Sequence, residues 1–478
     1  MTDIEPTPSL WQRMTAIPVT AWGVILLLTF FAAPVIFRLW SLSQVPDIGD
    51  PFDVAEFSKR DVPADQNAIL VYEAALTKYD KVNAAVKTDP DQHGRNPGIA
   101  FETRKNTPEE RELIAAWRIA HRDALLEWKR GTTFPLAQHA PLATFSSSVW
   151  SDIFSQVQRV SLLARLEAEE FEQQGDMAIA WEWHLASFRF SRHLGHKGTL
   201  LNRLFGKSVY LSAVNDLVRW AEHPAVKTDQ LRDALDEVRS SFSKTAPWAD
   251  VLKLEYVWLN EQLSKTTLHE LAAGGSGLFL REPVLSRQFR LWVVGEPHLL
   301  LRLQRQILAN SLEEMGKPLT QQRPKVSYSP LLFQVDSNRP DQMNPADIKF
   351  AVQRSFGNGT YWATGAVSNA FANHEEEGRQ AVLEVTLALQ RYRREHGEFP
   401  AELSRLVPQY LDVIPVDPCD PKGEPIRYRR EEPLKAVVWS VGPDHSDQGG
   451  VDLKPSNQNP KGDMGYIVPK GDMGYIVK

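Results

Sequence analysis

The stretch from Val160 to Gly195, VSLLARLEAEEFEQQGDMAIAWEWHLASFRFSRHLG, decides the fold class of this 478-residue chain. Apolar residues recur at helical spacing on both sides of the pair Gly175-Asp176, first at Val160, Leu163, Leu166 and Phe171 and then at Ala178, Trp181, Leu185 and Phe188. Glycine favours a helix end, and an aspartate side chain accepts hydrogen bonds from the free N–H groups that begin the next helix. The stretch therefore predicts an antiparallel helical hairpin in a mainly α protein.

Helical spacing continues for a long distance on either side of this hairpin. A further helix is expected from about Thr199 to Glu222, ended by His223-Pro224 because proline cannot continue a helix. The glycine-aspartate turn is similar to that of tetratricopeptide-type repeats, but no second copy follows at their period of roughly 34 residues. We expect an irregular α-helical domain over residues 66–316, between a linker over residues 41–65 and a Pro-rich connector over residues 317–374.

The N-terminal region contains a long run without charge, AIPVTAWGVILLLTFFAAPVIF, from Ala16 to Phe37. As a helix this run is long enough to cross a bilayer core. Arg13 and Arg38 bracket it, and Trp40 lies where indole rings prefer the membrane interface. A cleaved signal peptide shares this design, but no small-residue cleavage site follows the run. We expect an uncleaved transmembrane anchor over residues 16–40, with the lipid bilayer as its partner.

The charges that flank this anchor set its expected orientation. Positively charged residues favour the cytoplasmic side of a membrane span, but one arginine on each side makes the two counts nearly equal. The free amino terminus adds positive charge on one side, and Asp47, Asp50 and Asp53 follow the helix on the other. We therefore expect residues 1–15 to form a cytoplasmic tail. The rest of the chain is then a periplasmic or extracytoplasmic ectodomain on a bacterial inner membrane.

Composition excludes some partners and leaves few chemical motifs. The formal net charge of −6 gives no global basic field, so nucleic acid is not an expected partner. Cys419 is the only cysteine, which excludes an intrachain disulfide and a cysteine metal cage. His193 and His196 have a spacing that suits a metal pair, but Gly195 indicates that the helix ends there, where histidine also complements the helix dipole. No catalytic or cofactor-binding residue is predicted.

The last part of the chain predicts a small α+β unit over residues 375–478. A helix is expected from Glu375 to Gly397, followed by a short helix that begins at Pro400. Two strands then follow, from Ile426 to Arg429 and from Leu434 to Val441, joined by a tight turn. Helix first and then an antiparallel sheet is an α+β order.

This order resembles the globular domain of the major pseudopilins of type II secretion systems. The resemblance covers roughly the last 100 residues. Its ordered motifs are Tyr392, Gly397, Phe399-Pro400, Ile414-Pro415, Asp417-Pro418, Tyr428, Ser440, Gly442, Asp444 and Gly449-Gly450. The middle region is similar to bacterial single-pass membrane proteins that carry the same C-terminal unit, a likeness that implies no activity.

The resemblance implies a calcium site in the loop after the second strand. In that family the ion is held by the carbonyl at the position of Val441, by the aspartate that matches Asp444, and by acidic residues nearer the last strand. Asp447, Asp452 and Asp463 are the acidic residues available here, and Ca²⁺ takes six to eight oxygen ligands. The alternative is an Asp- and Gly-rich surface turn stabilised by side-chain to backbone hydrogen bonds.

Two features depart from the family pattern. No processing motif or intramembrane glutamate accompanies the apolar run, and a long helical region separates that run from the C-terminal unit, so we expect a stabilising or docking module rather than a pilus subunit. The chain also ends in a tandem duplication, PKGDMGYIV, at Pro460 to Val468 and again at Pro469 to Val477. We expect Gly465 to Val468 to form the last strand, with the second copy trailing or adding an edge.

Three functions remain open at this point. The first is a membrane-anchored cell-envelope protein with an interaction or scaffolding role, a protein partner and a structural calcium ion. The second is a hydrolase whose carboxylates converge in a cleft of the helical domain, although no known catalytic motif is visible. The third is an atypical type II secretion or pilus-like component. A deep pocket with convergent carboxylates would favour the hydrolase.

Overall fold

The computed structural model describes residues 19–59, 62–86, 108–139, 147–265, 267–269, 284–317, 374–442, 447–450 and 473–477. The chain divides into two compact units. The first comprises Met1–Val54, Leu259–Glu314 and Arg323–Gly365, and the second comprises Ala55–Trp258, Met315–Gln322 and Ala366–Lys478. The structure confirms the predicted fold class, because it is mainly helical with an apolar N-terminal helix and a small C-terminal antiparallel sheet.

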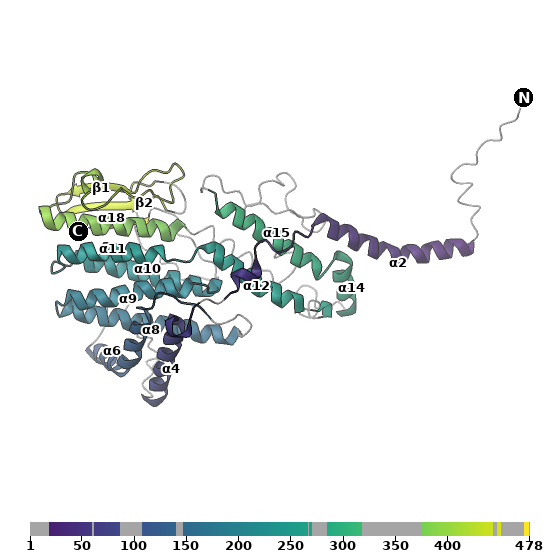
Figure 1. The fold of residues 1–478 in the computed structure, drawn as a ribbon, viewed down its shortest axis with the longest axis horizontal. Helices are drawn as coiled ribbons and strands as arrows, with labels where there is room; N and C mark the ends of the chain where they lie inside the picture. The colour runs from purple at the N-terminus through teal and green to yellow at the C-terminus, as the bar shows by residue number, and fades with distance from the viewer. Residues whose placement is uncertain are drawn as a thin grey trace, which may run out of the picture. The chain divides into compact units, whose positions relative to one another are not determined.

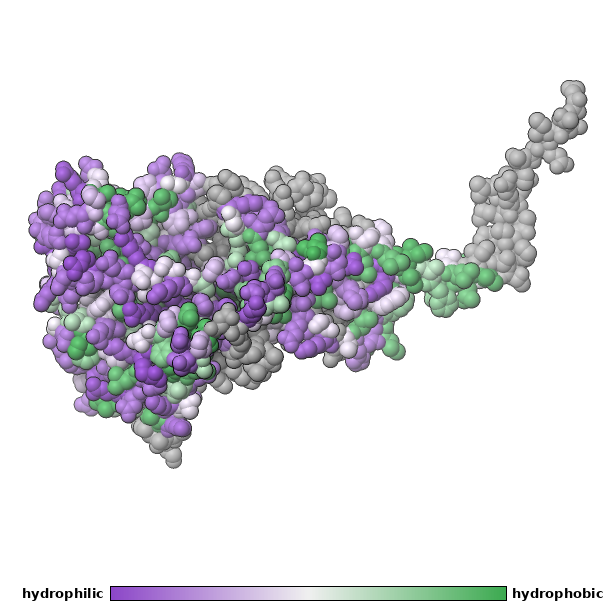
Figure 2. Space-filling model, viewed as in Figure 1, coloured by the Kyte–Doolittle hydropathy of each residue, from purple (hydrophilic) through white to green (hydrophobic). Residues whose placement is uncertain are grey.

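The first unit is built around helix α2 (Val19–Gln44), with α14 (Val284–Val294) and α15 (His298–Met315) beside its C-terminal end (Figure 1). Within α2, the segment Leu26–Ser43 is long and apolar enough to cross a membrane. Its large apolar side chains are exposed, and Figure 2 shows them as a hydrophobic surface. A helix that is apolar on all sides and unburied by protein is typical of a membrane span.

The second unit begins with a helical array (Figure 1). Its elements are α3 (Val54–Phe57), the 3-10 turn η1 (Ala64–Gln66), α4 (Ala68–Val86), α6 (Pro108–Ala120), α7 (Arg122–Gly131), α8 (Ser147–Gln173), α9 (Met177–Gly195), α10 (Leu200–Glu222), α11 (Thr228–Ser243) and α12 (Trp248–Lys265), the last of which runs on into the first unit. The predicted hairpin is α8 and α9. Gly175 turns the chain with a φ of +80°, and Asp176 accepts a hydrogen bond of 3.1 Å from the Ile179 N–H. The helix expected from Thr199 is α10, which Thr199 caps.

The C-terminal part contains α18 (His374–His396), the 3-10 turn η6 (Leu403–Leu406), β1 (Arg427–Glu432), β2 (Lys435–Ser440) and β3 (Met473–Val477). The sheet is antiparallel with strand order β1-β2-β3. In the register, Val438 of β2 is paired with Tyr428 on one side and Tyr475 on the other. Strand β3 comes from the second copy of the duplication, whereas the first copy at residues 460–468, expected to form this strand, lies outside the described residues.

Helix α18 joins the sheet to the helical array. One face packs against the sheet and the other against α10 and α11 (Figure 1). Its middle is buried all round, as with Val382, Val385 and Leu389, and the same hydrophobic core includes Tyr210 and Leu217 of α10. The helical array and the α+β part of the second unit therefore share one core.

Candidate functional site

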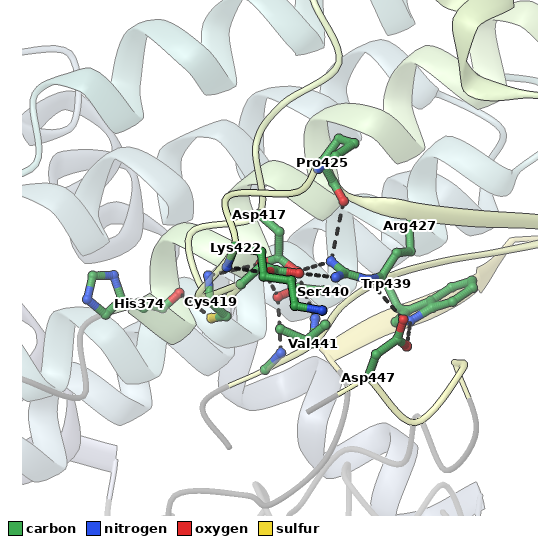
Figure 3. A network of polar contacts seen from close by, with 12 residues as sticks. His374, Asp417, Cys419, Lys422, Pro425, Arg427, Trp439, Ser440, Val441 and Asp447 are labelled. Carbon is green, nitrogen blue, oxygen red and sulfur yellow. Dashed lines mark hydrogen bonds and ion pairs between the residues drawn. The ribbon is translucent and has the colours of Figure 1, made fainter. Parts of the chain in front are cut away.

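The loops around the end of β2 are organised by the buried carboxylate of Asp417 (Figure 3). Its Oδ1 accepts hydrogen bonds from the Cys419 N–H at 3.0 Å and from the Ser440 hydroxyl at 2.7 Å. Its Oδ2 accepts from the Val441 N–H at 2.8 Å and from Arg427 Nη1 at 3.0 Å. Asp417 therefore fastens its loop to the end of the central strand, and four donors compensate for burying its charge.

Arg427 supplies the positive charge at this site. Its guanidinium forms ion pairs with Asp417 at 3.0 Å, with Asp447 at 3.0 Å and with Asp420 (Figure 3). Burial alone would lower the pKa of Arg427, but these carboxylates outweigh burial and raise it. One guanidinium thus bridges three carboxylates and reduces the repulsion among them.

Of the residues predicted to bind calcium, the structure describes Val441 and Asp447, while Asp444, Asp452 and Asp463 lie outside the described residues. Asp447 already uses both of its oxygens. Oδ2 accepts from Arg427 Nε at 3.0 Å, and Oδ1 accepts from Trp439 Nε1 at 3.0 Å and the Gly449 N–H at 2.8 Å. Within the described ranges, no group of three acidic, histidine or cysteine side chains is arranged to hold a metal ion.

The calcium site stays a prediction, because most of its proposed ligands are not described. What the structure shows of the loop is an ion-pair network that Arg427 completes. The resemblance to pseudopilins therefore receives neither support nor contradiction from these residues.

Cys419 has a structural role beside this network. Its thiol is buried and donates to the carbonyl of His374 at 3.2 Å. Burial, together with the nearby Asp417 carboxylate, raises the pKa of Cys419 to about 12. Because the reactive form of cysteine is the thiolate, this residue is not a nucleophile at neutral pH.

A second charged cluster, which sequence patterns did not reveal, lies in the core between α18 and the helical array. The carboxylate of Glu376 on α18 is buried, 2.8 Å from Arg192 Nη2 of α9, and accepts from Arg203 Nη1 of α10 at 3.1 Å. Burial alone would raise the pKa of Glu376, but the two guanidinium groups lower it to about 2. The run HEEEG indicates only an acidic helix start, which complements the helix dipole on any surface helix.

A pocket with a volume of about 410 Å³ lies next to Arg192 in the helical array. It is bounded by the loop after α7, the C-terminal half of α9 and the end of α11, and it is lined by Thr132, Thr133, Phe134, Pro135, Leu136, Ala137, Arg189, Arg192, His193, His196, Ser241 and Lys244. No carboxylate occurs among these lining residues. The pocket therefore has a basic lining.

The two histidines of the pocket do not form a metal pair. His193 Nδ1 is 2.7 Å from the Tyr72 hydroxyl, and His196 Nδ1 is 2.7 Å from the carbonyl oxygen of Ala137. Burial, followed by the positive charges nearby, lowers the pKa of His193 to about 4. His193 is therefore neutral at pH 7 and serves as a structural hydrogen-bonding group.

The cations of the pocket differ in how far they are neutralised. Arg192 is paired with Glu376, and Arg189 donates to Glu237 at 2.6 Å. Lys244, which is exposed, has no ion-pair partner among the residues that the structure describes. This arrangement can attract an anionic group, but it offers no carboxylate as a general acid or base.

No protein-family model, curated protein or solved structure matches this chain.

Proposed function

We propose that this chain is a membrane-anchored protein of the bacterial cell envelope with an interaction role, binding a partner that presents an anionic group to the basic pocket. Residues 16–40 would cross the inner membrane once, with the folded ectodomain on the periplasmic side. The observation that carries the proposal is the basic lining of the pocket, which contains Arg189, Lys244 and His196 and no carboxylate.

The chemistry of these side chains suits an oxyanion. Guanidinium and ammonium groups bind phosphate and carboxylate through charge-assisted hydrogen bonds, which are stronger than neutral ones. Basic residues at the ends of α9 and α11 also complement the helix dipoles, and this accounts for part of their presence. The exposed ammonium of Lys244 remains available for a ligand, because it has no anionic partner within the described ranges.

Two observations weigh against the other functions. A hydrolase of the expected kind needs convergent carboxylates, whereas the lining of this pocket is basic and its His193 is already hydrogen-bonded to Tyr72. A pilus-like subunit is expected to have a processing motif and an intramembrane glutamate with its apolar helix, and neither accompanies the run from Ala16 to Phe37.

Titration with pyrophosphate, a compact oxyanion probe, tests the proposed binding role. The full-length protein in detergent is titrated by calorimetry, and the variants Lys244→Gln and Arg189→Gln are compared with Lys227→Gln, which removes the same charge from an exposed position immediately before α11 and outside the pocket. We expect saturable binding that weakens about tenfold, or about 1.4 kcal/mol, in either pocket variant and stays unchanged in the control. No saturable binding, or an equal loss in the control, would overturn the proposal.

A further inference from the structure

Helix α14 is held tightly against the end of α2. Arg38 Nη1 donates to the carbonyl oxygen of Trp292 and, at 3.2 Å, to that of Glu296. The Arg38 guanidinium also lies over the Trp292 ring, 5.2 Å from its centroid. Gly295 has a φ of +112°, and a Cβ at this position would come within 3.0 Å of Leu42. These contacts place α14 at the level where the apolar surface of α2 ends.

Helix α15 contacts the last turn of α2 and the residues that follow it. Arg302 Nη1 donates to the carbonyl oxygen of Leu42 at 2.7 Å, and Arg305 forms an ion pair of 2.7 Å with Asp47. Gln306 donates to the carbonyl oxygen of Pro46 at 2.9 Å. Helices α14 and α15 are therefore both bound to the C-terminal end of α2 and the residues after it (Figure 1).

An apolar stripe on α14 is left uncovered. Leu285 is 78% exposed and Phe289 is 57% exposed, and their spacing of four residues places them on one face of the helix. The Phe289 ring stacks on Trp292 with a centroid distance of 6.3 Å, so the stripe continues to the residue that contacts Arg38. The helix sequence, VLSRQFRLWVV, contains two arginines and no acidic residue.

From these contacts we infer that α14 lies in the interface of the bilayer that α2 crosses. Leu285 and Phe289 then contact the acyl boundary, and the positive charge of the helix attracts anionic phospholipid headgroups. Helices that lie in the membrane plane combine an apolar face with basic residues and aromatic side chains in this way. The inference rests on the anchoring role proposed for α2. A lipid surface fits better than a protein partner, because the contacts of Arg38 and Arg302 already hold the stripe next to a membrane span.

Three leucine-to-cysteine variants of the full-length chain test the inference. Leu28→Cys lies within the span, Leu285→Cys lies on α14, and Leu434→Cys lies in the β1–β2 turn, and the three leucines are 63%, 78% and 57% exposed. Each variant is labelled with an environment-sensitive fluorophore and reconstituted into vesicles of phosphatidylethanolamine and phosphatidylglycerol. Lipids with a spin label high on the acyl chain then quench a fluorophore near the boundary, and lipids with a spin label near the end of the acyl chain quench a fluorophore near the bilayer centre, where position 28 lies. Unlabelled Cys419 is buried, and the chain without an added cysteine measures its background.

We expect strong quenching at positions 28 and 285 and severalfold weaker quenching at position 434. Quenching at 28 without quenching at 285 would overturn the placement of α14 and leave the anchor intact. Absence of quenching at both positions would overturn the anchor and the inference together. Equal quenching at 434 would show general adsorption of the protein to the vesicles, which would also overturn the inference.

Vesicles of phosphatidylcholine alone provide the second measurement. Without anionic headgroups, we expect the quenching of the label at position 285 to fall at least twofold while that at position 28 stays unchanged. Unchanged quenching at 285 would overturn the part of the inference that assigns anionic lipid as the ligand.

Discussion

Arg203 of α10 donates a hydrogen bond of 3.1 Å to the carboxylate of Glu376 on α18, across 173 residues of sequence. Arg192 of α9 reaches the same carboxylate at 2.8 Å, and all three side chains are buried. This cluster ties the C-terminal part of the second unit to its helical array through charge as well as through apolar packing.

Replacing Glu376 with glutamine should strongly destabilise the fold. Removing one partner of a buried ion pair leaves the remaining charges uncompensated, which costs about 3 to 5 kcal/mol. Chemical denaturation of the second unit measures the change. The matched control is Glu377→Gln on the same helix, whose side chain is 42% exposed and lies 3.3 Å from His374 Nδ1, and we expect a change below about 0.5 kcal/mol. Equal effects of the two variants would contradict the role assigned to the cluster.

The same cluster predicts loss of stability in acid. The pKa of Glu376 is lowered in the folded state from its ordinary value of 4.5 to about 2. Its contribution is therefore present above pH 4.5 and is lost as the pH falls toward 2, because the unfolded state then takes up the proton first. Thermal unfolding between pH 6 and pH 2 should show this loss, and Glu376→Gln should lack it. A variant that keeps the full acid dependence would assign the loss to other carboxylates.

Glu255 should have the opposite effect on stability. Burial raises its pKa to about 7, although its carboxylate accepts a hydrogen bond of 2.6 Å from the Leu200 N–H at the start of α10. Because the unfolded state loses this proton near pH 4.5, Glu255 destabilises the fold increasingly from pH 4.5 to about 7. Glu255→Gln keeps the acceptor without the charge and should stabilise the protein by about 2 kcal/mol at pH 8, with little change at pH 4.

The control for this prediction is Glu261→Gln, on the same helix but with a partly exposed side chain paired to Lys265. We expect it to leave stability nearly unchanged at both pH values. Destabilisation by Glu255→Gln at pH 8 would show that the charge of Glu255 has a partner that compensates for its burial.

Replacing Asp417 should lower the free energy of unfolding, because its carboxylate accepts four hydrogen bonds. Asp417→Asn removes the charge that Arg427 pairs with and replaces an oxygen that accepts hydrogen bonds with an amide donor. A loss of about 2 to 4 kcal/mol is expected, since the Val441 N–H and the Ser440 hydroxyl compete for the remaining acceptor. Asp412→Asn provides the comparison, because the Asp412 side chain is 96% exposed. Its unfolding midpoint should match that of the unmodified protein.

The predicted calcium site can be tested against this network. If calcium binds to the loop, millimolar Ca²⁺ should raise the melting temperature relative to chelator. The free energy of unfolding should rise by roughly 2.7 kcal/mol at a hundredfold excess of Ca²⁺ over the dissociation constant. Asp444→Ala should remove the increase. Absence of a shift in the unmodified protein would mean that the loop is a turn without a ligand.

The sequence alone was sufficient to predict those helices and strands whose pattern lies within a few residues or recurs at a regular spacing. The pair Gly175-Asp176 ends one helix and caps the next through contacts within a few residues, so the hairpin of α8 and α9 follows from spacing. The apolar run of α2 and the order of helix and strands after residue 374 are local in the same sense. The choice between two identical copies of PKGDMGYIV is not a local matter, because both have the same propensity, and the strand that the structure describes beside β2 comes from the second copy.

The sites depended on contacts that no spacing reveals. Asp417 belongs to a motif visible in the sequence, but its partners Arg427 and Val441 come from other segments. Glu376 meets Arg192 only because α18 packs onto α10 and α11. The basic pocket is likewise built from three segments. Helix and strand formation is set by short-range backbone geometry and apolar periodicity, which the sequence of this protein determined by itself. Which charges become buried together is set by long-range packing, and only the tertiary structure decided it.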